Sequence, residues 1–281
     1  VEPLSHGELE AMIEELPRHP LGVSTEPDGV RLSLGGIQDK LVLRRLSSGQ
    51  FGLPRGGTPS DCLLKPDYGR YEDLAANEAF CMVVAAATGL EAAATEIVTV
   101  GSTPCLYVRR FDRAIDDGGH LRRLHQEDMC QALGVLPAAK YEGNGGPSVA
   151  AIVELLRTMG SVRAALDVNA FMKAVLLNFL LGNNDAHGKN FALFYDPAVG
   201  TRLAPLYDVV STAVYPELTS RMAMSVGGVD DPEEVDLATW GRLASESGLG
   251  GQLPGLVRAW SADVLARAEE AREAAVEEGW H

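Results

Sequence analysis

The apolar pattern of the sequence changes near residue 112, and this change limits the folds that the chain can adopt. Before it, short apolar runs bounded by glycine and proline alternate with helical stretches, a pattern typical of mixed helices and strands. After it, apolar residues recur mainly at helical spacing over longer segments. We therefore expect an α+β fold in two lobes, a small mixed N-terminal lobe at 1–111 and a larger, mostly helical C-terminal lobe at 112–281.

The N-terminal lobe is predicted to begin with a short helix. Ser5 and Glu8 have the spacing of a capping box, and Pro17 stops the helix that they begin. Glycine and proline also separate the strands of this lobe. We expect a helix at 5–16, two strands around a glycine turn within 30–45, a loop at 47–61, a strand at 62–65 stopped by Pro66, a helix from Asp73 to Gly89, and strands at 97–100 and 105–108.

The C-terminal lobe is expected to be helical apart from one β segment at 191–210. That segment reads as a strand at 191–195, a turn at Asp196 and Pro197, and a return over 203–210. The spacing of apolar residues predicts helices at 126–133, 148–159, 168–181, 235–247 and 255–278.

The polar loop at 183–190, NNDAHGKN, lies between a predicted helix and a predicted strand. It offers a carboxylate at Asp185 and a carboxamide at Asn190, and the returning chain adds a second carboxylate at Asp208. Protein kinases use the same logic, in which one Asp orients the attacking hydroxyl while an Asn and a second Asp hold Mg²⁺. Spacing alone leaves an ordinary turn equally open, because Asn, Asp and Gly are common turn formers. By themselves, His187 indicates a hydrogen-bonded loop histidine and Lys189 a solvated side chain.

Two upstream groups could contact phosphates, although each signal is weak alone. Lys65 ends a predicted strand, and the predicted helix that follows carries Glu78. Kinases use a strand lysine, held by a helix glutamate, to grip the phosphates, but a lysine at a strand end is also an ordinary edge feature. Gly35 and Gly36, close after Ser33, could present backbone N–H groups to phosphates or form only a tight turn.

The composition argues against several classes of function. With 24 Lys and Arg against 39 Asp and Glu, a formal net charge of −15, the chain by itself is a poor nucleic-acid binder. No apolar run is long enough to cross a membrane, and no signal peptide is visible. Cys62, Cys81, Cys105 and Cys130 form no CxxC pair, which favours reduced thiols in a cytoplasmic protein.

Eight segments, taken together and in order, resemble the HipA family of toxin kinases. Any one of them alone is far less specific than the collinear set, which spans residues 32 to 211. The segments are LSLGGIQDK at 32–40, LLKP at 63–66, NEAF at 77–80, VRRFDR at 108–113, RLHQEDMCQALG at 123–134, KYEGNGGPS at 140–148, NNDAHGKNFALF at 183–194 and RLAPLYDVVS at 202–211.

The resemblance implies a two-lobed kinase fold and assigns roles by position. Asp185 corresponds to the catalytic aspartate, and Asn190 and Asp208 correspond to the Mg²⁺ ligands. Ser33 matches the serine that such kinases autophosphorylate, which switches the enzyme off. The positions assigned to ATP binding are Lys65 at the phosphates, Arg109 and Phe111 in the linker that faces adenine, Asp112 facing ribose, Gln126 and His187 near the nucleotide, and Ser33, Gly35 and Gly36 in the glycine loop.

The resemblance further implies an ATP- and Mg²⁺-dependent serine/threonine protein kinase that is the toxin of a toxin–antitoxin system. Its expected partners are a protein substrate, for which the family suggests an aminoacyl-tRNA synthetase, and an antitoxin, a DNA-binding HipB-like protein or a small HipS-like protein. Because few residues precede the glycine loop, the chain resembles the short toxins of three-gene systems, which lack the N-terminal subdomain. A small-molecule or lipid kinase on a related scaffold and a non-catalytic module of a repressor complex are the alternatives.

Overall fold

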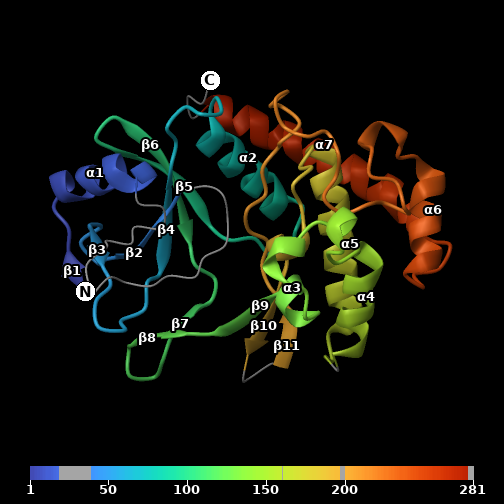
Figure 1. The fold of residues 1–281 in the computed structure, drawn as a ribbon, viewed down its shortest axis with the longest axis horizontal. Helices are drawn as coiled ribbons and strands as arrows, with labels where there is room; N and C mark the ends of the chain where they lie inside the picture. Colours follow the sequence, from blue (N-terminus) through green and yellow to red (C-terminus); the bar gives the residue numbers. More distant parts are fainter. Residues whose placement is uncertain (19–38, 160, 197–199, 278–281) are drawn as a thin grey trace. The chain divides into compact units, whose positions relative to one another are not determined.

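The structure is a computed structural model that describes residues 1–18, 39–159, 161–196 and 200–277 (Figure 1). The chain divides into two units, one made of Val1–Ala79 with Ala93–Arg123 and the other of Phe80–Ala92 with Leu124–His281. The lobe boundary expected between residues 111 and 112 stays a prediction.

The first unit is built on a six-stranded antiparallel sheet with the strand order β1-β3-β2-β4-β6-β5. The strands β5 and β6, which contain the strands expected at 97–100 and 105–108, pair as a hairpin over residues 95–109. A second, two-stranded hairpin pairs β7 with β8. The bounds are β1 Glu2–Pro3, β2 Leu41–Arg45, β3 Phe51–Leu53, β4 Cys62–Pro66, β5 Thr95–Val100, β6 Thr103–Arg109, β7 Arg113–Ile115 and β8 Leu121–Arg123.

The helix α1, His6–Glu15, begins as the sequence predicts and covers part of this sheet. The hydroxyl of Ser5 accepts the backbone N–H of Glu8, and the carboxylate of Glu8 accepts the N–H of Ser5, so the capping box is complete. A 3₁₀ turn, Leu16–Arg18, follows it. Leu9 and Ile13 of α1 pack into one buried apolar cluster of the unit, whose other members are Leu4, Leu16, Leu41, Leu43, Cys62, Leu64, Val100 and Cys105.

The helix α2, Leu74–Ala87, confirms the predicted helix between Asp73 and Gly89. It begins directly after Asp73, whose carbonyl accepts the N–H of Asn77 at 2.8 Å. It ends before Gly89, whose φ of +79° is a left-handed conformation that favours glycine. Residues up to Ala79 belong to the first unit and the rest of the helix to the second.

The second unit combines a three-stranded antiparallel sheet with a group of helices (Figure 1). The sheet has the order β11-β10-β9, and the long helix α5 contacts β11, α4 and α7. The bounds are β9 His125–Asp128, β10 Ala192–Asp196, β11 Gly200–Leu203, α3 Met129–Ala132, α4 Val149–Thr158, α5 Ala164–Leu180, α6 Leu237–Glu246 and α7 Leu253–Glu277, with 3₁₀ turns η3 Pro137–Ala139, η4 Glu142–Asn144, η5 Gly188–Asn190 and η6 Pro232–Glu234.

Four local expectations differ from the structure. The expected loop at 47–61 contains β3, because this short segment pairs with both β1 and β2, and such partners are not visible in the local sequence. The expected helix at 126–133 is divided, because Asp128 ends β9 and caps α3. The hairpin of β7 and β8 lies in the region expected to be mostly helical. The return strand is Gly200–Leu203 rather than 203–210.

The helices expected at 148–159, 168–181, 235–247 and 255–278 are confirmed as α4, α5, α6 and α7. The strand expected before Leu41 lies outside the described residues. Within the described residues, none of the helices combines the length and the apolar character that crossing a membrane requires.

Candidate active site

The loop that follows α5 is fixed at its start by Gly182. The carbonyl of Gly182 accepts the N–H groups of Thr212 at 3.0 Å and Ala213 at 2.9 Å. Its φ is +68°, and a Cβ at this position would lie 2.7 Å from Cβ of Ala213. A side chain here would therefore meet both backbone strain and a collision, so the close approach of the two segments requires glycine.

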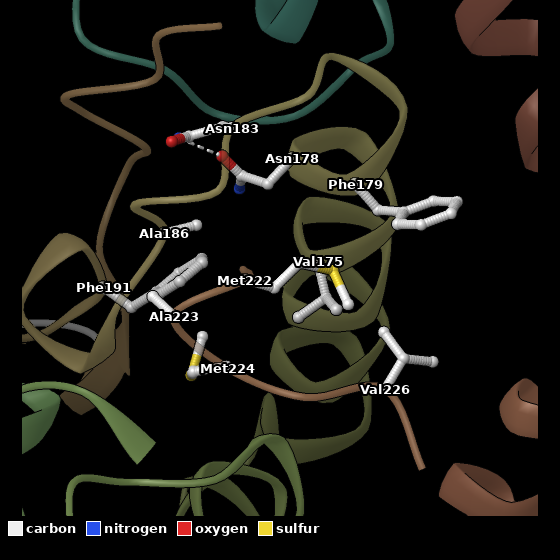
Figure 2. Close-up of a pocket in the computed structure, with 10 residues that line it drawn as sticks. All are labelled: Val175, Asn178, Phe179, Asn183, Ala186, Phe191, Met222, Ala223, Met224 and Val226. Atoms are coloured by element: carbon white, nitrogen blue, oxygen red, sulfur yellow. Dashed lines mark hydrogen bonds between the residues drawn. The ribbon is translucent and has the colours of Figure 1, made fainter. Parts of the chain in front are cut away.

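A chain of amide hydrogen bonds connects α5 to the backbone of Asp185. Nδ2 of Asn178 donates to the carbonyl of Ala174 at 2.8 Å, and its Oδ1 accepts Nδ2 of Asn183 at 2.6 Å (Figure 2). Oδ1 of Asn183 in turn accepts the N–H of Asp185 at 3.2 Å. Asn178 and Asn183 are both buried. Replacing either one by an apolar residue would therefore leave the amide of the other without this hydrogen bond in a buried environment, which costs stability.

A small cavity of about 20 Å³ lies beneath this loop, lined mostly by apolar side chains (Figure 2). That volume is enough for about one water molecule. Both amides of the Asn178–Asn183 pair reach it, together with Val175, Phe179, Ala186, Phe191, Met222, Ala223, Met224 and Val226. The loop is therefore supported by a packed apolar floor rather than by a ligand-sized pocket.

The carboxylate of Asp185 accepts a hydrogen bond at one oxygen, and its side chain is half-exposed. Its Oδ1 accepts the hydroxyl of Tyr141 at 2.9 Å, and its Oδ2 lies 3.9 Å from Nε2 of His187. The side chain of Asp185 is 46% exposed, whereas that of His187 is 8% exposed. Burial lowers the pKa of His187, although the neighbouring Asp185 opposes this shift. At neutral pH, His187 is therefore an uncharged ring beside the carboxylate.

The side chains of Asn190 and Asp208 lie together, as the kinase-like spacing predicts for a shared ion. Nδ2 of Asn190 donates to Oδ2 of Asp208 at 2.9 Å, while Oδ1 of Asn190 accepts the N–H of His187 at 3.2 Å. Asp208 has a φ of +60°, which is uncommon for a residue other than glycine. Strained backbone of this kind is often found at functional sites, where the surrounding structure holds it in place.

The oxygen atoms of this pair are of the kind that Mg²⁺ prefers. Mg²⁺ in kinases commonly takes one or two protein oxygen ligands and completes its shell with phosphates and water. A carboxylate and a carboxamide on adjoining segments fit that requirement. No cluster of three or more His, Cys, Asp or Glu side chains suited to a metal occurs in the part of the chain that the structure describes. An ion here would therefore depend on the phosphates of a nucleotide for further ligands.

Lys189 is not the solvated side chain that the sequence alone indicates. Its Nζ contacts Oδ2 of Asp128 at 2.6 Å, and the two side chains are only 20% and 14% exposed. The carbonyl of Lys189 also accepts the hydroxyl of Tyr207 at 2.8 Å. A Cβ at the preceding Gly188 would lie 2.8 Å from Cγ of Pro147. The second half of the loop is therefore fixed by an ion pair, a hydrogen bond and close packing.

In the first unit, Lys65 forms a buried ion pair with Glu78. Lys65 lies on β4, opposite Leu106 of β6, and Glu78 lies on α2. The Nζ and Oε1 atoms are 2.6 Å apart, and the side chains are 5% and 3% exposed. The strand lysine and helix glutamate are thus brought together, as the pattern of phosphate-gripping lysines in kinases suggests.

Three further predicted nucleotide contacts, Arg109, Phe111 and Asp112, lie at the end of β6 and directly after it. Arg109 is exposed at the end of β6, and Phe111 is half-buried after it. The buried carboxylate of Asp112 accepts two hydrogen bonds from Arg110 at 2.9 and 2.7 Å, and Arg113 lies 2.7 Å away. Although burial raises the pKa of Asp112, these two arginines hold it below its usual value.

The remaining predicted site residues are Gln126, Ser33, Gly35 and Gly36. Gln126 lies on β9 opposite Phe194 of β10. The three glycine-loop residues lie outside the described residues. Sequence reasoning missed Tyr141, Asn178 and Thr212, which hold the loop. Tyr141 stands in one of the family-like segments, but nothing in its local pattern indicates a contact with Asp185.

Comparison with known proteins identifies one family. Residues 32–277 match the HipA-like C-terminal domain. The protein named "Putative kinase Y4mE" of Sinorhizobium fredii is 43% identical over 248 residues, 88% of this chain and 58% of its own length. The serine/threonine-protein kinase toxin HipA of Shewanella oneidensis is 31% identical over 223 residues, 73% of this chain and 49% of its own length. The chain thus spans about half the length of these curated relatives, 58% and 49%.

The fold leads to the same family. A chain in the solved complex of HipA, HipB and operator DNA from the toxin–antitoxin system of Shewanella oneidensis MR-1 matches with a TM-score of 0.81 and 28% sequence identity. The match covers 98% of this chain and 65% of that one. It confirms the expected mixed fold of helices and sheet in its HipA form. On the family match over most of its length and on these relatives, the chain belongs to the HipA-like C-terminal domain family.

Proposed function

We propose that this chain is an ATP- and Mg²⁺-dependent kinase that transfers the γ-phosphate of ATP to serine or threonine hydroxyls of a protein. The observation that carries the proposal is the grouping of Asp185, Asn190 and Asp208 around one fixed loop, with the last two side chains 2.9 Å apart. The relatives named as kinases support the same chemistry.

Asp185 is the proposed proton acceptor. Its half-exposed side chain can meet a substrate hydroxyl, while the N–H of its backbone is fixed by Asn183. As the hydroxyl oxygen attacks the γ-phosphorus, the bond from phosphorus to the ADP oxygen breaks, and the hydroxyl proton moves to the carboxylate. The products are a phosphorylated side chain, ADP and one proton, which Asp185 later releases to water.

Asn190, Asp208 and Lys65 are the proposed contacts of the phosphates and their ion. Asn190 and Asp208 would hold Mg²⁺, which when bound neutralises phosphate charge. The amide oxygen of Asn190 has two lone pairs, so it can accept the N–H of His187 and still serve as a ligand. The ammonium of Lys65, oriented by Glu78 at 2.6 Å, is a suitable donor to phosphate oxygens.

The further roles rest on the family resemblance. Nucleotide binding by Arg109, Phe111, Asp112, Gln126, His187, Gly35 and Gly36 is proposed from position alone, as is autophosphorylation of Ser33. Because one relative is named a kinase toxin, we propose that the chain acts as the toxin of a toxin–antitoxin pair. A HipB-like antitoxin is the proposed partner, since the matching solved structure is a complex of HipA with HipB and DNA. An aminoacyl-tRNA synthetase is the proposed substrate.

A labelling experiment tests the central proposal. The purified chain is incubated with Mg²⁺ and ATP labelled at the γ-phosphate, in the presence of a bacterial protein extract or of small metabolites and lipids. We expect label on serine or threonine of proteins, and its loss when EDTA removes Mg²⁺. Label found only in metabolites or lipids would favour a small-molecule kinase. Absence of both label and Mg·ATP binding would favour a non-catalytic module and overturn the proposal.

A further inference from the structure

We infer that Tyr141 is a positioning residue for phosphoryl transfer, which holds one oxygen of the Asp185 carboxylate so that the other oxygen can face the acceptor hydroxyl. The inference rests on the proposed function, because it matters only if Asp185 accepts the hydroxyl proton. Tyr141 stands 44 positions before Asp185 in the chain. It directly precedes η4, and its side chain is half-buried.

The contact fixes the plane of the carboxylate. The hydroxyl of Tyr141 donates to Oδ1 of Asp185 at 2.9 Å, and Oδ2 lies 3.9 Å from Nε2 of His187. The rings of Tyr141 and His187 meet edge to face, with centroids 5.4 Å apart and an interplanar angle of 73°. The terminal torsion of an aspartate is broad, so an unbound carboxylate would sample many orientations. A hydrogen bond to Oδ1, with a packed ring beside Oδ2, restricts that range.

Tyr141 is itself held firmly by the turn that follows it. Its carbonyl accepts the N–H groups of Asn144 at 3.0 Å and Gly146 at 2.8 Å. A Cβ at Gly146 would lie 2.5 Å from the carbonyl oxygen of Ala139 and 2.6 Å from that of Tyr141. Because backbone atoms cannot move aside as a flexible side chain can, this close turn requires glycine.

A single residue, Ala223, connects the Tyr141 turn to the catalytic loop. Its carbonyl accepts the N–H of Glu142 at 3.0 Å, and its own N–H donates to the carbonyl of Asn184 at 2.8 Å. The residues that it contacts are the immediate neighbours of Tyr141 and Asp185 in the chain. Donor and acceptor are thus fixed to one backbone segment, which orients the hydrogen bond before any substrate arrives.

Tyr141 acts through Asp185 rather than by transferring a proton itself. Burial and the hydrogen bond to Asp185 raise the pKa of Tyr141 to about 12. At neutral pH the phenol therefore keeps its proton and remains a donor throughout the reaction. The proton of the substrate hydroxyl goes to Oδ2 of Asp185, and the Tyr141 proton stays where it is.

The variant Tyr141→Phe tests this role, since it removes only the hydroxyl and keeps the ring beside His187. We expect kcat to fall by roughly 10- to 100-fold, as misplacement of a reacting group by about 1 Å can cause. The Kd of Mg·ATP and the melting temperature should stay unchanged. Tyr195→Phe is the matched control, because the Tyr195 hydroxyl also donates to a carboxylate, that of Glu127 at 2.6 Å, in the same unit. Its kcat should equal that of the unmodified chain.

A double-mutant cycle separates positioning from general damage. If Tyr141 acts through Asp185, then Asp185→Asn and Asp185→Asn combined with Tyr141→Phe should have the same residual rate. A Tyr141→Phe variant with unchanged kcat overturns the positioning inference but leaves the kinase proposal intact. The positioning inference is also overturned if Tyr141→Phe lowers kcat but lowers the melting temperature or weakens Mg·ATP binding to a matching extent. Transfer that does not depend on Asp185 overturns this inference together with the proposed role of Asp185, whereas an unmodified chain that neither transfers phosphate nor binds Mg·ATP overturns the proposed function itself.

Discussion

The two units treat their key charged groups in opposite ways. In the first unit, the side chains of Lys65 and Glu78 are almost completely buried and compensate each other at 2.6 Å. In the second unit, the carboxylate of Asp185 is half-exposed, and its closest described partner is the neutral hydroxyl of Tyr141. The buried charges of Lys65 and Glu78 are therefore stabilised by each other, whereas the charge of Asp185 is stabilised by solvent and by the hydroxyl of Tyr141.

Because of this difference, substitutions at Lys65 or Glu78 should lower the stability of the fold, whereas substitutions at Asp185 should affect mainly activity. Removing one member of a buried ion pair leaves an uncompensated charge and typically costs about 3–5 kcal/mol. Changing a half-exposed carboxylate on a fixed loop should cost little stability, because water already solvates it. The loop around Asp185 is supported from below by amides and apolar side chains, and those supports do not depend on its charge.

The largest effect is expected for Asp185→Asn. The amide keeps the shape of the side chain but cannot accept the hydroxyl proton, so kcat should fall by roughly 10²- to 10⁴-fold. The melting temperature and the Kd of Mg·ATP should hardly change, because the loop frame and the Asn190–Asp208 pair remain. Steady-state kinetics, calorimetry and thermal unfolding of the same preparation measure all three.

Asp230→Asn is the control for this variant. Asp230 is an exposed carboxylate in the same unit and pairs with Arg221 at 3.0 Å. It should retain full activity. Near-normal turnover by Asp185→Asn would remove Asp185 from the role of proton acceptor and end the contrast between the two sites.

Lys65→Met should lower both stability and activity. Without the ammonium, the buried carboxylate of Glu78 loses its contact with Nζ of Lys65 at 2.6 Å, and the free energy of unfolding should fall by about 3 kcal/mol, the lower end of the range typical of broken buried ion pairs. The proposed phosphate contact disappears as well, so ATP binding should weaken. Urea unfolding and nucleotide titration check the two effects separately.

A second substitution distinguishes the two effects of Lys65. In Lys65→Met combined with Glu78→Leu, no charge is left buried, and much of the lost stability should return, since apolar replacements of buried ion pairs are often well tolerated. Nucleotide affinity should not return. Arg55→Met is the matched control, because the pair of Arg55 with Glu2 at 2.9 Å is exposed and such pairs contribute little. If the double variant regained ATP binding, Lys65 would be a structural residue only.

Asp208→Asn sharpens the contrast within the second unit. Asn tolerates the left-handed backbone of this position and can still accept Nδ2 of Asn190, so the fold should persist. Loss of the negative ligand should weaken Mg·ATP binding by at least about tenfold, in the range seen when metal sites are perturbed. Binding of ATP without Mg²⁺ should be unaffected. Equal loss with and without Mg²⁺ would move the ion to another site.

The parts of the fold that the sequence predicts well are those set by local chemistry. The capping box of Ser5 and Glu8 and the end of α2 at Gly89 depend on residues a few positions apart, and both are confirmed. The strand β3 was missed because it exists through its pairing with β1 and β2. Its own three residues carry no signal that separates a strand from a loop.

The same distinction applies to the candidate site. Asp185 and Asn190 are five positions apart in one loop, so their spacing could be interpreted directly, and the adjoining β hairpin indicated Asp208. The contacts that orient them come from distant segments. Tyr141 reaches Asp185 across 44 positions, and Thr212 holds the N–H of Asn184 across 28. Such supports have no spacing rule, because each depends on how separate segments pack.

Asp167 offers a third case, a buried carboxylate whose charged partner is farther away. Its side chain is 4% exposed, and Oδ1 lies 4.0 Å from Nε of Arg163, compared with 2.6 Å in the Lys65–Glu78 pair. Burial raises the pKa of Asp167, although the backbone of Leu203 and the nearby arginines oppose this. Arg163 at 4.0 Å therefore does not offset the effect of burial on the pKa of Asp167.

Asp167→Asn should consequently stabilise the chain slightly at neutral pH. A carboxyl whose folded-state pKa lies above its unfolded value, about 3.9, contributes stability that is fully present below the unfolded value and is lost as the pH rises through the folded-state pKa. Since Asn carries no charge at any pH, the free energy of unfolding at pH 7 should rise slightly, and the gain should vanish below about pH 4. Urea unfolding at both pH values measures it, with Asp263→Asn, an exposed pair with Arg267 at 3.5 Å, as the control. A loss of stability at pH 7 would mean that Arg163 compensates Asp167 across 4.0 Å, and that the close contact of Lys65 and Glu78 is not what distinguishes the first unit.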